Sequence, residues 1–127
     1  MGLLSFLRGP AKQPPVSIRD DNFEAEVIRS ELPVLIDVWS PGCAPCKHLE
    51  PVFMEMAARY EGRVKICEMN TMGAPQATMA LGVRGTPTFV FFKEGKPIET
   101  IVGVRSSLFF NDAIEQLFGE PKTAPSA

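Results

Sequence analysis

Two cysteines three positions apart, Cys43 and Cys46, are the residues of this sequence best suited to chemistry. They follow an apolar run of strand length and open a segment with helical periodicity, within residues 37–47. A thiol at a helix N-terminus faces unpaired backbone N–H groups and the positive end of the helix dipole, which lower its pKa below the usual value of about 8.5. The spacing lets the two sulfurs close a small, easily attacked disulfide ring. We therefore predict a redox pair in which Cys43, at the exposed start, is the nucleophile and Cys46, one turn inside, resolves the mixed disulfide.

A metal site, a haem attachment site and a pair of inert core cysteines are the alternatives for this motif. Structural zinc needs four ligands, and only Cys67 and His48 remain as further Cys or His side chains. Haem attachment needs a histidine directly after the second cysteine, where this chain has Lys47. Flanking glycine and proline residues are not typical of core packing. We expect no metal, and we place His48 on the surface.

The third cysteine, Cys67, falls inside a predicted strand. Free cysteine is among the most buried residue types and packs as a small hydrophobe. We interpret Cys67 in this way, with a regulatory thiol as the alternative.

Hydrophobic periodicity predicts the elements that must position the pair. Apolar runs predict five strands, at residues 16–18, 33–39, 64–69, 88–92 and 97–102, with a tight turn at 93–96. Helical spacing predicts helices at 43–60, kinked at Pro51, and at 74–81 and 107–118. A further helix is expected after the N-cap candidates Asp20, Asp21 and Asn22. Alternating elements followed by a hairpin predict an α/β protein with a mixed sheet and helices on both faces.

Composition limits the class of protein. The chain has 127 residues, and thirteen Lys and Arg against fifteen Asp and Glu give a net charge of −2. This balance offers no electrostatic attraction for nucleic acid, and no apolar run is long enough to cross a membrane. We predict a flexible extension at 1–14, one domain at 15–119 and a disordered tail at 120–127. The first residues lack the pattern of a secretory signal, so a cytoplasmic location is expected, although a small amphipathic segment that touches a partner or a membrane surface is an alternative for them.

Several separated motifs resemble the thioredoxin family, and the resemblance spans residues 16–119. They are Asp37-Val38-Trp39, Cys43-Ala44-Pro45-Cys46-Lys47, Pro51, Gly82-Val83-Arg84-Gly85-Thr86-Pro87-Thr88 and Gly103. The resemblance implies a thioredoxin fold, with a central mixed sheet of about five strands and about four helices. It also implies a thiol–disulfide oxidoreductase.

The resemblance assigns further roles around the cysteines. Asp37 lies in an apolar strand, where burial raises the pKa of a carboxyl group, and the family's equivalent aspartate is a proton shuttle for the inner cysteine. A carboxylate that only hydrogen-bonds the neighbouring backbone is the alternative. Pro87 is implied to be a cis-proline beside the disulfide, with the backbone of Thr86 pairing with a bound client strand. The remaining residues that the resemblance places at the site are, for substrate binding, Gly42, Ala44 and Gly103 and, in support, Trp39, Pro45, Lys47 and Glu68.

Three positions depart from the family pattern. Gly42 stands where a tryptophan is usual, Ala44 replaces a glycine, and Glu68 occupies a strand position that commonly holds a lysine. If Glu68 points toward Asp37, the two carboxylates together raise at least one pKa further.

The resemblance implies a general protein-disulfide reductase, with a disulfide oxidase or isomerase and a non-catalytic adaptor as alternatives. Retained Pro45 and the absent secretory signal favour the reductase. The chain carries no nucleotide-binding motif, so no cofactor is expected in it. By family analogy, NADPH would supply electrons through a partner flavoprotein similar to thioredoxin reductase. The expected partners are that reductase and disulfide-containing client proteins, with the protein itself a monomer.

Overall fold

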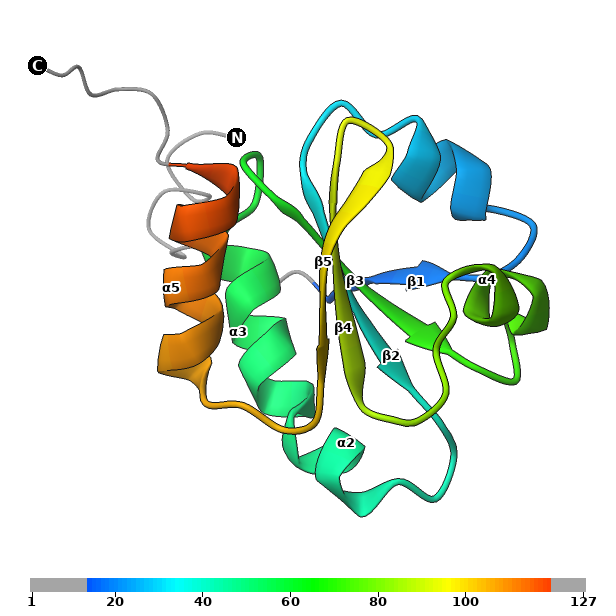
Figure 1. Ribbon diagram of the computed structural model, residues 1–127. Coiled ribbons are helices and arrows are strands. Elements are labelled where there is room, and N and C mark those ends of the chain that lie inside the picture. Colours follow the sequence, from blue (N-terminus) through cyan, green and yellow to red (C-terminus); the bar gives the residue numbers. More distant parts are fainter. Residues whose placement is uncertain (1–13, 120–127) are drawn as a thin grey trace, which may run out of the picture.

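A five-stranded mixed β-sheet forms the centre of the protein, in a computed structural model that describes residues 14–119 (Figure 1). The strands are β1 (Val16–Ile18), β2 (Val34–Trp39), β3 (Lys65–Asn70), β4 (Thr88–Lys93) and β5 (Lys96–Val102). Their order is β1-β3-β2-β4-β5, with β1, β3 and β2 parallel and β4 and β5 each antiparallel to its neighbour. The predicted α/β class and mixed sheet are confirmed. The expectations for residues 1–13 and 120–127 lie outside the described residues.

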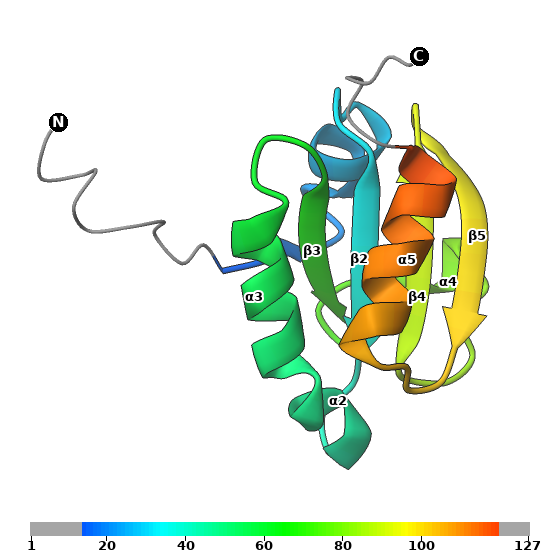
Figure 2. The same cartoon turned by 90° about the vertical axis from the view of Figure 1, so that its left-hand side faces the viewer.

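Helices cover both faces of this sheet. They are η1 (Glu24–Ile28), which is a single π-helical turn, α2 (Ala44–His48), α3 (Glu50–Arg59), α4 (Pro75–Ala80) and α5 (Ser107–Phe118). Figures 1 and 2 show α3 and α5 on one face, with α4 and the blue η1 on the other. Within residues 14–119, no helix is both long enough and apolar enough to span a membrane.

The helix predicted at 43–60 is divided into α2 and α3 at Leu49, which ends one helix and precedes the other. Pro51 lies in the first turn of α3, where its missing N–H has no partner to lose. At Leu49 the backbone N–H donates to the carbonyl of Cys46, three residues back, at 3.1 Å, which closes the last turn of α2. The predicted kink is therefore a complete break, so the cysteine pair has its own short helix at the end of β2.

The N-cap role predicted for Asp20, Asp21 and Asn22 is wrong. Phe23 precedes η1, and no side chain caps this helix. The Asp20 carboxylate instead accepts hydrogen bonds from the N–H groups of Gln76 and Ala77, at 3.1 and 2.9 Å, at the start of α4. Two of the free donors of α4 are thereby satisfied, and this loop is tied to the start of α4.

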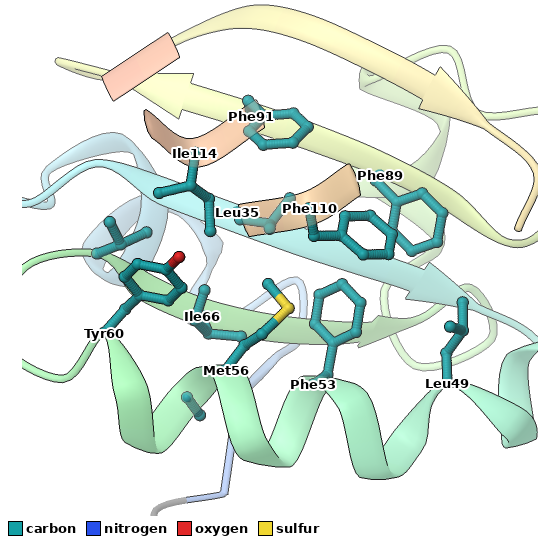
Figure 3. Close-up of a cluster of buried hydrophobic side chains, with 12 residues drawn as sticks. Leu35, Leu49, Phe53, Met56, Tyr60, Ile66, Phe89, Phe91, Phe110 and Ile114 are labelled. Atoms are coloured by element: carbon teal, nitrogen blue, oxygen red, sulfur yellow. The ribbon is translucent and has the colours of Figure 1, made fainter. Parts of the chain in front are cut away.

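The core consists of two clusters, because successive side chains of β2 point to opposite faces of the sheet. On one face Leu35 packs with Phe53 of α3 and Phe110 of α5 (Figure 3). On the other face Ile36 packs with residues of η1 and α4. The alternation places Asp37 in the same row as Leu35. A carboxylate therefore occupies the α3 side of β2, close to the end of an apolar core.

Removal of the Asp20 carboxylate tests its capping role. We expect Asp20→Ala to lower the free energy of unfolding by about 1 kcal/mol, the usual contribution of an N-cap. Urea unfolding measures the change. The matched control is Asp21→Ala, because Asp21 has only an exposed ion pair with Arg19 and such pairs contribute little. Equal losses in the two variants would contradict the assignment.

Candidate active site

Cys43 and Cys46 are joined by a disulfide at the N-terminus of α2, with their Cα atoms 5.3 Å apart. Cys43 is the N-cap residue and is half-buried, whereas Cys46 is only 4% exposed. The Cys46 N–H donates to the Cys43 sulfur at 3.2 Å. An N–H directed at this sulfur stabilises its thiolate once the bond is reduced. The geometry thus gives Cys43 the accessible sulfur that its predicted role as nucleophile requires, and Cys46 the inner position.

Residues Ser40 to Cys43 form a tight turn between β2 and α2. The Cys43 N–H donates to the Ser40 carbonyl at 3.2 Å, and Gly42 has a φ of +83°. Proline followed by a residue of positive φ is the signature of a type II turn, which favours glycine at its third position. The Pro41-Gly42 pair therefore explains why a bulky residue is absent directly before the first cysteine. Gly42, Ala44 and Pro45 are all exposed.

Asp37 is buried, with only 4% of its surface exposed, and its Oδ1 has no hydrogen-bond partner in the described structure. Burial raises the pKa of Asp37 from 3.8 to about 7, with smaller contributions from the charges of Glu68 and Glu50. The predicted rise in this pKa is confirmed. A carboxyl group that titrates near neutral pH can both accept and return a proton under ordinary conditions.

Glu68 lies directly across from Asp37 in the parallel register of β2 and β3. Its Oε1 accepts a hydrogen bond from the indole N–H of Trp39, the last residue of β2. Trp39 therefore holds the Glu68 carboxylate beside the site. The hypothesis that Glu68 raises the pKa of Asp37 agrees with the charge contribution from this residue.

Glu50 was missed by sequence reasoning. It is the first residue of α3, directly after the break at Leu49, so the spacing in the sequence does not reveal its position near Asp37. Glu50 is exposed but contributes to the raised pKa of Asp37.

An open pocket of about 570 Å³ connects these groups. Its lining includes both cysteines, Asp37, Trp39, Lys47, Glu50 and Glu68, with Pro15, Phe53 and Met54 among the apolar residues. Asp37 and Cys46 thus share one solvent-connected space although each is itself buried. Because the pocket is open to solvent, it connects the Asp37 carboxyl group with bulk water.

The loop before β4 does not line this pocket, but one side-chain hydrogen bond joins it to the cysteine loop. The Thr86–Pro87 peptide bond is cis, as predicted. The Gly103 N–H donates to the Pro87 carbonyl at 2.9 Å, so the structure brings together two of the residues assigned to substrate binding. Thr86 is tied to the cysteine loop by a hydrogen bond of 2.6 Å between its Oγ1 and the Oγ of Ser40. Ser40 did not stand out in the sequence, because a lone serine carries no motif.

The remaining candidates lie apart from this chemistry. Cys67 is fully buried, and burial raises its pKa to about 12. Such a thiol stays protonated, which agrees with its interpretation as a buried hydrophobe. His48 is exposed at the end of α2. Among residues 14–119, no cluster of three or more His, Cys, Asp or Glu side chains is arranged to hold a metal ion.

The raised pKa of Asp37 predicts how stability depends on pH. Folding keeps Asp37 protonated between pH 3.8 and about 7, so the folded protein loses stability as the pH rises through this window. Asn cannot lose a proton. We expect oxidised Asp37→Asn to be more stable than the wild type above pH 7, by at most about 4 kcal/mol at about 1.36 kcal/mol per pKa unit, and the gain to vanish below about pH 4. Urea unfolding across this range measures it. A gain independent of pH, or one shared by the exposed control Asp112→Asn, would contradict the prediction.

Glu68→Gln tests the charge at this position. Glutamine keeps an oxygen that can accept from Trp39 but removes the negative charge, so we expect the pKa of Asp37 to fall. Titration of the Asp37 carboxyl carbon by NMR measures the shift. Glu99→Gln on the exposed β5 is the control, since Glu99 makes no contribution to the pKa of Asp37. An unchanged pKa in Glu68→Gln would show that the two carboxylates do not interact.

Comparison with known proteins places this geometry in a family. A family model described as thioredoxin matches residues 14–116. Thioredoxin 1 of Nostoc sp. is 36% identical over 99 residues, covering 78% of this chain and 92% of the relative. Thioredoxin of Synechocystis sp. is 41% identical over 86 residues, covering 68% and 80%. The chloroplastic thioredoxin M-type of Spinacia oleracea is 36% identical over 99 residues, covering 78% and 55%. This protein, with its Cys43–Cys46 disulfide, belongs to the thioredoxin family and is a thiol–disulfide oxidoreductase.

Proposed function

We propose that this protein is a general protein-disulfide reductase of the cytoplasm that works as a monomer. The observation that carries the proposal is the Cys43–Cys46 disulfide at a helix N-terminus, sharing one pocket with a carboxyl group whose pKa is about 7. The relatives are named thioredoxins, which supports electron transfer from this protein to the client disulfide.

The reaction begins with the reduced pair. The Cys43 thiolate attacks one sulfur of a client disulfide, a new S–S bond forms, and the other client sulfur leaves as a thiolate that takes up a proton. Asp37 accepts the proton of the Cys46 thiol across the shared pocket, and the Cys46 thiolate then attacks the Cys43 sulfur. The second client sulfur leaves as a thiolate and takes up the proton that Asp37 accepted, so that a client thiol forms and Asp37 is again ionised. Two electrons have moved to the client, and Cys43 and Cys46 are again a disulfide.

Regeneration of the dithiol needs a two-electron donor. We propose that NADPH supplies it through a partner flavoprotein similar to thioredoxin reductase. No nucleotide-binding motif was found in the sequence, so the electrons would have to arrive by disulfide exchange with that partner. Lys47, exposed on α2 beside the disulfide, is available to face either partner.

The reduction potential of the pair is the decisive measurement. We expect equilibration with a thiol redox buffer to give a value at or below about −230 mV, in the range of reducing proteins. We also expect the wild type and Cys67→Ser to reduce a disulfide-bonded peptide, because Cys67 is buried away from the site. Cys43→Ser should lose this activity. A potential well above about −200 mV would instead favour a disulfide oxidase or isomerase, and full cellular activity in Cys43→Ser would favour an adaptor.

A further inference from the structure

Ser40 connects the two loops that form the active site. Its Oγ lies 2.6 Å from the Oγ1 of Thr86, and the two residues are 46 positions apart in the chain. Both side chains are half-buried, so this hydrogen bond is partly shielded from water. A bond between such distant segments fixes one loop relative to the other.

The same serine also holds the cysteine loop. Its carbonyl accepts the N–H of Cys43 at 3.2 Å. Thus the backbone of Ser40 positions the first cysteine, and its side chain reaches the residue before the cis-proline. One residue is thereby bonded both to the loop of the reactive sulfur and to Thr86.

The neighbouring parts of the cis-proline loop have anchors of their own. The Thr88 hydroxyl donates to the Gly85 carbonyl at 2.6 Å, and the Pro87 carbonyl accepts from Gly103 at 2.9 Å. Thr86 lies between these anchors, beside the exposed Gly85. In the part of the chain that the structure describes, the hydrogen bond to Ser40 is the contact that holds its side chain.

We propose that Ser40 is a positioning residue for the reaction with peptide disulfides, acting through Thr86. The proposal rests on the proposed function and on the pairing of a client strand with the backbone of Thr86, which the family resemblance implies, while Cys43 attacks the client disulfide. Attack requires the two sulfurs to be held close together and in line. A client strand fixed at Thr86 brings its disulfide to Cys43 only if the two loops keep their separation. A small disulfide that makes no strand contacts does not depend on this separation.

The test compares two substrates in reduced wild type, Ser40→Ala, Thr86→Val and the double variant. One substrate is a peptide with an intramolecular disulfide, and the other is hydroxyethyl disulfide. We expect each single variant to lower the ratio of kcat/KM for the peptide to that for the small disulfide by about threefold to tenfold, the loss typical of one hydrogen bond. The double variant should lose no more than either single variant, because both remove the same bond.

Two further variants separate positioning from general disruption. Thr86→Ser restores the hydroxyl that Thr86→Val lacks and should therefore recover the ratio that Thr86→Val loses. Ser17→Ala, at an exposed site on β1, should also retain it. The proposal is overturned if Ser40→Ala keeps the wild-type ratio, if both substrates slow equally, or if the losses in the single variants add. Failure of the wild type itself to reduce either substrate would instead refute the proposed function.

Discussion

The central strand β2 is the element on which the rest of the structure depends. It is paired with β3 on one edge and β4 on the other, and five of its six residues are buried. A strand fixed in this way has little freedom to slide or turn, because any shift of one residue would send every side chain to the opposite face. Asp37 on this strand and the turn that follows it therefore have defined positions. The short helix α2 starts from this fixed point, which is why a helix of five residues can hold a reactive pair in place.

The buried carboxyl group of Asp37 lowers the stability of the fold, but it supplies the proton transfer that the cysteine pair needs in the proposed reaction. A carboxyl group in the row of Leu35, with one oxygen unpaired, has lost much of its hydration. A cationic partner would offset this cost, but the neighbours Glu68 and Glu50 are negatively charged and instead favour the protonated form of Asp37. The indole of Trp39 retains Glu68 in this position. Proton transfer by Asp37 therefore takes place beside negative charges. The family commonly has a lysine at the position of Glu68, which would place a positive charge there.

Local patterns predicted most of this structure, and contacts across the chain account for what they missed. The cysteine spacing, the strand runs and the helix disturbance expected at Pro51 are all local signals, although the structure divides that helix at Leu49. Asp20 misled the prediction because it has the residue type of an N-cap, whereas its partners Gln76 and Ala77 are more than fifty positions away. The bond between Ser40 and Thr86 was invisible for the same reason. Sequence periodicity describes which face a residue occupies, but it does not reveal which distant backbone a polar side chain will meet.

The position of Trp39 gives the protein an optical property. It is the single tryptophan of the chain, and its indole lines the same pocket as both cysteine sulfurs. A disulfide quenches a nearby excited indole by accepting an electron, whereas a pair of thiols does so much less. The fluorescence of the protein should therefore brighten when the pair is reduced, without interference from a second indole. Gly42 occupies the position where the family usually has another tryptophan. The indole emission of this protein therefore comes from Trp39 and reports the state of the Cys43–Cys46 bond.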